Sequence, residues 1–162
     1  MTEYKKMFFA SWKRAAILAA AWGAIVGAMS LIINAIPDLT IILLVVLIPL
    51  SLLAPVIIGF ITTREYANNS RIELNAAAPN GAISGIVYAI VMVAISLAFI
   101  TLNYAVSSFI WGLSEGFGSF FEVAVQGIIV AIGTLIVGLP VLAIVSMICG
   151  AIGGAAYSYI KK

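Results

Sequence analysis

Residues 64–80 read REYANNSRIELNAAAPN and form the only long polar run between the first apolar residues and the C-terminus. This run separates two apolar stretches, each long enough for a pair of membrane-spanning helices. It also carries Arg64 and Arg71, so like the two ends of the chain it contains basic residues. The stretch therefore predicts two helical hairpins joined by one polar loop.

The composition indicates that this protein is surrounded by lipid. Hydrophobic residues make up 64% of the chain and charged residues 9%, whereas soluble domains are about half apolar and a quarter charged. A core built from 162 residues cannot bury such an excess. The apolar runs are continuous and do not alternate, which favours helices over a membrane barrel. We predict an all-α membrane protein located in the cell membrane.

The positions of the charges predict the number of spans. The basic residues fall in three places, the N-terminus, the central loop and the C-terminus: Lys5, Lys6, Lys13, Arg14, Arg64, Arg71, Lys161 and Lys162. The positive-inside rule then places both termini and the central loop in the cytoplasm, which requires an even number of spans. A five-span alternative, with residues 123–160 broken near Pro140, leaves the C-terminal lysines outside and needs a turn with almost nothing polar in it.

The predicted organisation is one membrane domain over residues 1–162. An interfacial N-terminus covers 1–14, and a tight turn at Pro37 and Asp38 follows the first span. The four predicted spans cover 15–36, 39–62, 81–102 and 134–160. The cytoplasmic loop is 64–80, and an extracytoplasmic interfacial segment covers 103–133. The last segment is glycine-broken and aromatic-rich, so we expect one or two short helices at the membrane surface.

A short motif recurs in three of the spans. Residues 23–27 read GAIVG, residues 81–85 read GAISG and residues 150–154 read GAIGG. Aligning Pro49 with Pro140 also aligns Gly59 with Gly150. The two hairpins therefore look like parallel repeats about an axis along the membrane normal.

Small residues at every fourth position predict close helix packing. They lie on one helical face, where small side chains let backbones approach each other in lipid. The predicted packing residues are Gly23, Gly27, Gly81, Gly85, Ser146, Gly150, Gly154 and Ser158. The packing is either within the bundle or against a second copy or a partner subunit.

Aromatic residues near the two membrane surfaces are the candidate contacts. They are Trp12, Phe109, Trp111, Phe117, Phe120 and Phe121. Aromatic rings suit the headgroup depth, and exposed aromatics are also what a protein partner binds. Trp12 belongs to an aromatic and basic segment that either forms a collar on the first span or binds anionic lipid or a partner.

Several classes of function lack the residues they need. No charged residue lies within a predicted span, which disfavours a pump or a proton-coupled transporter. The chain has no histidine and a single cysteine, Cys149, and it shows no phosphate loop, zinc spacing or catalytic triad. Glu115 and Glu122 lack accompanying metal ligands, so solvent-facing charges explain them best. We predict no enzyme, no cofactor, no metal and no nucleic-acid partner.

The last span, ending GAIGGAAYSYIKK, and the GAISG motif that opens the third span resemble small archaeal four-helix membrane proteins of unknown function. The resemblance covers residues 81–85 and 150–162. It implies four helices and no catalytic residues.

Two hypotheses follow. The first is a structural or interaction protein, either an accessory subunit of a membrane complex or a homo-oligomer. The alternative is a small channel or facilitator for a neutral or small solute, in which hydroxyl side chains line a narrow pathway between the proline-kinked spans. A lipid-directed enzyme at the outer surface is a third and weaker interpretation.

Overall fold

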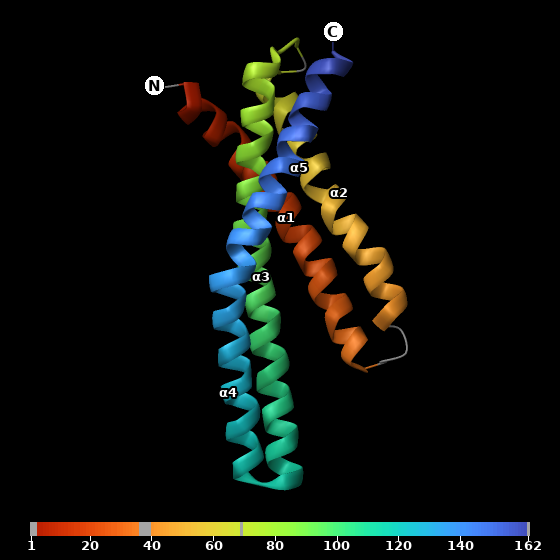
Figure 1. Cartoon of the computed structure of the whole chain (residues 1–162), viewed down its shortest axis with the longest axis vertical. Helices are drawn as coiled ribbons and strands as arrows, with labels where there is room; N and C mark the ends of the chain where they lie inside the picture. The colour runs from red at the N-terminus through yellow and green to blue at the C-terminus, as the bar shows by residue number, and fades with distance from the viewer. Residues whose placement is uncertain (1–2, 36–39, 69, 162) are drawn as a thin grey trace.

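The chain is an elongated bundle of helices that run along its long axis in both directions (Figure 1). The computed structural model describes residues 3–35, 40–68 and 70–161, and within these ranges it contains helices and no strand. The elements are α1 (Glu3–Ala35), α2 (Thr40–Tyr66), α3 (Leu74–Glu115), α4 (Phe117–Gly133), the π-helix η2 (Thr134–Gly138) and α5 (Leu139–Ile160). The predicted turn at Pro37 and Asp38 lies outside the described residues.

Three stretches are long and apolar enough to cross a membrane, counted over the described part of the chain. They are Val45–Tyr66, Leu74–Glu115 and Phe117–Ile160. Helix α1 has four basic residues near its N-terminus and is not among them. The predicted helical fold is therefore confirmed, and its apolar helices are those expected of a membrane protein. The exact membrane boundaries remain predictions.

Helices α3 and α4–η2–α5 form a long hairpin around Gly116, which has a φ of 96°. Such a backbone angle suits glycine, because a Cβ atom is strained there. In each of four contacting pairs, the two partners are the same number of residues away from Gly116, to within one. The pairs are Gly112 with Phe120, Tyr104 with Gly127, Gly81 with Gly150 and Ala77 with Gly154. The two arms therefore keep one register from the turn to the opposite end.

The sequence predicts residues 103–133 as one or two short helices apart from the spans, and the structure does not confirm this separation. Residues 103–115 continue α3 without a break, and α4 continues through η2 into α5. Figure 1 shows both arms running along the long axis of the molecule, beyond the end of α1 and the start of α2. Gly116 forms the turn of the hairpin, whereas Gly112 and Gly127 stay helical and pack against Phe120 and Tyr104 of the opposite arm.

The polar loop is shorter than the predicted range 64–80. Helix α2 continues to Tyr66 and α3 begins at Leu74, so residues 67–73 connect them. Pro79 falls inside α3, in a stretch that contains three alanines and packs against α2 and α5. Tertiary packing therefore extends both helices into the polar stretch.

The two hairpins differ in their contacts, although the sequence predicts a repeat. Gly81 lies against Gly150 within the second hairpin. The equivalent residue of the first hairpin, Gly23, lies against Met92 and Ile95 of α3. The packing therefore does not repeat, and a common origin of the two hairpins stays a prediction.

Pro55 lies inside α2 and is fully buried. A proline has no N–H, so the carbonyl four residues earlier, that of Ser51, lacks its helical partner. The hydroxyl of Tyr88 on α3 lies 3.5 Å from this oxygen and donates to it. A neighbouring helix thus compensates for the missing hydrogen bond, as membrane helices require.

Candidate functional site

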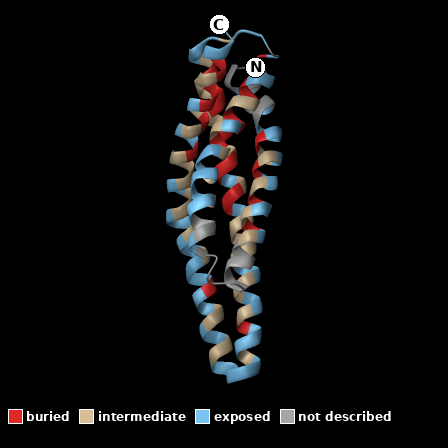
Figure 2. Ribbon diagram, turned by 90° about the vertical axis from the view of Figure 1, so that its right-hand side faces the viewer, coloured by how far each residue is buried: buried red, intermediate tan, exposed pale blue. Residues whose placement is uncertain are grey.

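Three helices meet at glycines in the half of the molecule that contains the chain ends. A Cβ atom on Gly150 of α5 would overlap the carbonyl oxygen of Gly81 on α3, and one on Gly59 of α2 would overlap the carbonyl of Gly150. On the next turn of α5, a Cβ on Gly153 would overlap the carbonyl of Val56. Backbones thus touch on two sides of α5, and the buried residues concentrate in this half (Figure 2).

The structure brings most of the predicted packing residues together on one contact. Five of those on α3 and α5 face each other or the α2 backbone, and all five are buried: Gly81, Gly85, Ser146, Gly150 and Gly154. Ser158 is also buried, and its hydroxyl donates to the carbonyl of Ala155 within α5. Gly23 and Gly27 lie elsewhere, on the face of α1 that packs against Met92, Ile95 and Phe99 of α3.

Sequence reasoning missed the contribution of α2 to this contact. Ser51, Pro55, Gly59 and Thr63 follow one another at intervals of four, so they share one helical face. Pro55, Gly59 and Thr63 are buried, and Ser51 is half-buried. The interval of four was visible in the sequence. The set contains a proline and two hydroxyl side chains besides one glycine, so it does not look like a stripe of small packing residues.

A chain of buried hydroxyl and amide groups joins α2 to α3 beside the glycines. The Thr62 hydroxyl lies 2.6 Å from that of Ser84, which donates to the carbonyl of Asn80 at 3.0 Å. The Asn80 amide nitrogen donates to the hydroxyl of Thr63 at 3.1 Å. All four residues are fully buried. These groups bond one another, which stabilises the α2–α3 contact where water is absent.

Ser146 provides the contrast to this network. Its hydroxyl is buried and finds no hydrogen-bond partner among the described residues.

Thr62→Val should destabilise the bundle by about 1 kcal/mol, because it removes an interhelical bond. Ser146→Ala should be neutral or stabilising, because it removes an unsatisfied group and adds no volume. Unfolding by SDS in mixed micelles measures both, and equal losses for the two variants would contradict this difference.

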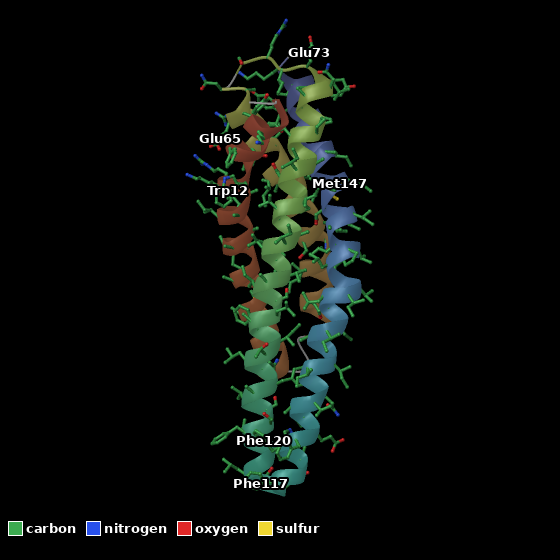
Figure 3. All side chains as sticks on the ribbon, turned by 90° about the vertical axis from the view of Figure 1, so that its left-hand side faces the viewer. Trp12, Glu65, Glu73, Phe117, Phe120 and Met147 are labelled. Carbon is green, nitrogen blue, oxygen red and sulfur yellow. The ribbon has the colours of Figure 1, made fainter. Side chains whose placement is uncertain are left out.

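The opposite end of the molecule carries the predicted aromatic contacts. Phe109 and Trp111 lie on α3, and Phe117, Phe120 and Phe121 lie on α4. Phe117 is 82% exposed, and Phe109, Trp111 and Phe121 are exposed as well. Phe120 instead packs into the hairpin against Gly112 and meets Phe121 edge to face at 5.5 Å. Figure 3 shows Phe117 and Phe120 at the end of the hairpin.

Two open apolar hollows flank this aromatic group. One of about 230 Å³ is lined by Phe109, Gly112, Leu113, Phe117 and Phe120. A second of about 320 Å³ follows the groove between α3 and α4 and includes Tyr104, Ser108 and Ala124. We call residues 103–133 of the hairpin the distal arm. Its surface combines exposed rings with hollows the size of apolar side chains.

The distal arm is acidic. Glu115 and Glu122 are exposed, and the Ser119 hydroxyl donates to Glu115 at 3.4 Å. The sequence has no lysine or arginine between Arg71 and Lys161. The carboxylates are therefore not balanced by cations of the same arm.

The geometry gives little support to a metal site. Over the described residues, no three acidic or cysteine side chains gather in a way that could hold a metal ion. Cys149 is a half-buried residue of α5.

No known protein family, curated protein or solved structure matches this chain. Its own residues are therefore the basis for a proposal.

The N-terminal candidate, Trp12, lies on the part of α1 that precedes the bundle core. It is 38% exposed. Two residues further on, Arg14 forms an ion pair of 2.6 Å with Glu65 near the end of α2. The pair fixes α1 beside α2 but is worth at most about 1 kcal/mol at such exposure. Tyr4 and Phe8, which precede Trp12 at intervals of four and are expected to share its helical face, have side chains outside the described part of the structure.

Proposed function

We propose that this protein is an integral membrane bundle with a structural or interaction role, in which the distal arm binds a membrane-protein partner. In this proposal four spans cross the cell membrane, both termini face the cytoplasm, and the protein acts as an accessory subunit or as a homo-oligomer. The observation that supports it best is the exposed aromatic surface of the distal arm.

The lengths of the helices support an arm that extends past the lipid core. Helix α3 has 42 residues and Phe117–Ile160 has 44, which correspond to about 63 and 66 Å. A bilayer measures about 40–45 Å with its headgroups. The excess of about 20 Å corresponds to about 13 helical residues, which is the length of the part of α3 within the distal arm.

Exposed apolar surface beyond the membrane favours a partner. Leu113 and Phe117 are 75% and 82% exposed at the end of the hairpin. Monomeric proteins rarely leave such contiguous apolar surface in water, and larger patches mark interaction sites. The acidic side chains favour a partner with basic groups over a second copy, since two copies would bring like charges together.

The distribution of cations supports the orientation. The end of α2, the loop 67–73 and the end of α5 lie at one end of the molecule with the start of α1 nearby (Figure 1), and the basic residues of the sequence belong to these parts. Cytoplasmic segments carry such an excess of lysine and arginine. The distal arm, at the other end, then faces away from the cytoplasm.

The channel alternative receives less support from the contacts. The buried hydroxyls of α2 and α3 bond one another or a backbone carbonyl, and glycine backbones touch beside them. A solute pathway needs polar groups that face an open space. We therefore place the hydroxyl groups in helix packing.

Cysteine labelling in intact cells tests the orientation. Ser114→Cys and Ser119→Cys, each in a Cys149→Ala background, should react with a membrane-impermeant maleimide added from outside. Lys13→Cys in the same background is the control and should react only after the cells are opened. The reverse pattern would overturn the proposed topology.

The mass of the particle in a mild detergent tests the interaction. We expect the protein to co-purify with a partner or a second copy at defined stoichiometry. A strictly monomeric particle without a partner, from membranes in which the protein occurs at its natural level, would contradict the interaction role.

A further inference from the structure

A hollow of about 360 Å³ lies at the end of the molecule opposite the distal arm. It lies between the loop 67–73 and the end of α5, and its lining includes Arg71, Glu73, Leu74, Tyr159 and Lys161. Glu73 appears at this end in Figure 3. Pockets of this volume hold small ligands or the headgroup of a larger one.

Two hydrogen bonds tie the walls of this hollow together. The Tyr157 hydroxyl on α5 donates to the carbonyl of Ser70 in the loop at 3.1 Å. Arg71 donates through Nε to the carbonyl of Lys161 at 3.2 Å. Tyr157 is itself buried and packs edge to face on Phe60 of α2. The hollow is thus part of the folded bundle.

The lining combines cations with apolar side chains. Arg71 and Lys161 are exposed, and neither forms an ion pair with a carboxylate that the structure describes. Leu74 and Tyr159 expose 45% and 59% of their surface at the same hollow. The first residue before α3, Glu73, makes no side-chain capping bond. The positive end of the α3 dipole and the negative end of the α5 dipole both lie at this hollow, so the side-chain cations decide its attraction for an anion.

We propose that this hollow binds the phosphate headgroup of an anionic phospholipid from the cytoplasmic leaflet. The proposal rests on the membrane placement proposed above. Arg71 and Lys161 attract the phosphate, and Leu74 and Tyr159 contact the first carbons of the acyl chains. A soluble anion would use the cations alone and would leave these apolar side chains exposed.

Arg71 also has a purely structural interpretation, because cations near a helix C-terminus stabilise its last carbonyls. The Lys161 side chain separates the two interpretations. This side chain makes no hydrogen bond to a helix end among the described residues, so its replacement should alter lipid binding and leave folding unchanged. Glu73 adds a test of opposite sign, since it repels an anion from the same hollow.

The experiment measures retained lipid by native mass spectrometry of the full chain in detergent. Dioleoylphosphatidylglycerol is compared with dioleoylphosphatidylcholine at equal concentrations. Each of Arg71→Gln and Lys161→Gln should lower phosphatidylglycerol binding about fivefold, because one cation near a membrane contributes about this factor. Glu73→Gln should raise it severalfold. Lys13→Gln, an equal loss of charge outside the hollow, should have no effect.

The outcomes separate the ligand from its alternatives. Equal effects of Lys13→Gln and Lys161→Gln would show a diffuse surface charge and overturn the site. Displacement of the lipid by an excess of inorganic phosphate would show an anion site without lipid specificity and overturn the lipid. No preference for phosphatidylglycerol in the wild type would overturn the inference as well. Carbonate extraction from membranes tests the membrane placement separately.

Discussion

Gly150→Leu is expected to abolish the native bundle. Gly150 touches the backbone of Gly81 and Gly85 on α3, and the Gly59 position on α2 lies against its carbonyl. A leucine side chain has no space between two backbones, and neither neighbour can turn away as a side chain can. Overpacking in a well-packed core costs about 1–3 kcal/mol, and contact on two sides places this variant at or above the upper end.

Gly133→Leu is the matched control. Gly133 lies on the same continuous helix, is exposed, and has nothing within 4 Å of the position of an added Cβ. The control should lose no stability, and leucine should favour the helix slightly relative to glycine. Size-exclusion chromatography of fluorescent fusions in detergent and SDS titration compare the two. A folded, monodisperse Gly150→Leu protein would refute the backbone contact at this position.

Replacing three exposed rings of the distal arm should abolish partner binding and leave the bundle folded. The variant Phe109→Ala, Phe117→Ala and Phe121→Ala removes apolar surface that the monomer does not bury. Exposed substitutions of this kind change stability by about 0.5 kcal/mol or less. Aromatic hot spots each contribute 2 kcal/mol or more to an interface, so the association should weaken by at least about 100-fold.

The control for the aromatic variant removes apolar side chains from another exposed face. Ile144, Ile148 and Ile152 lie along α5 and are each about half exposed. Their triple replacement by alanine should leave the association intact, because we place this face in lipid. The mass of the purified particle and the yield of its partner measure both variants. Loss of association in the isoleucine variant alone would move the interface from the distal arm to α5.

The sequence predicts the helical fold because its apolar runs are continuous, and it predicts the glycine contact because small residues recur at intervals of four. Helix ends were less predictable. Glycines at 112, 116 and 118 give similar local signals, yet only Gly116 adopts a positive φ and breaks the helix. Gly112 stays helical because the side chain of Phe120 lies 3.1 Å from its Cβ position. Contacts between the arms decide this, and local propensity does not contain them.

The same limit applies to the polar contacts. Asn80 looks like a loop residue in the sequence, next to Pro79 and Gly81, but it is buried and bonds Thr63 seventeen residues earlier. The partner of an amide depends on which helices become neighbours, and the periodicity of one helix does not specify this. The exposed aromatics, by contrast, were recognisable from composition alone, since large rings between charged and small residues are typical of a surface.

The single register of the α3 and α4–α5 arms links their lengths in evolution. A residue inserted into one arm alone would move Tyr104 past Gly127 or loosen the turn at Gly116. Chains that share this hairpin should therefore gain or lose residues in both arms together. Seven residues per arm is the smallest change that nearly restores the helical phase, because seven residues make about two turns. The arm can then change its reach in steps of about 10 Å while the glycine contact at the other end stays the same.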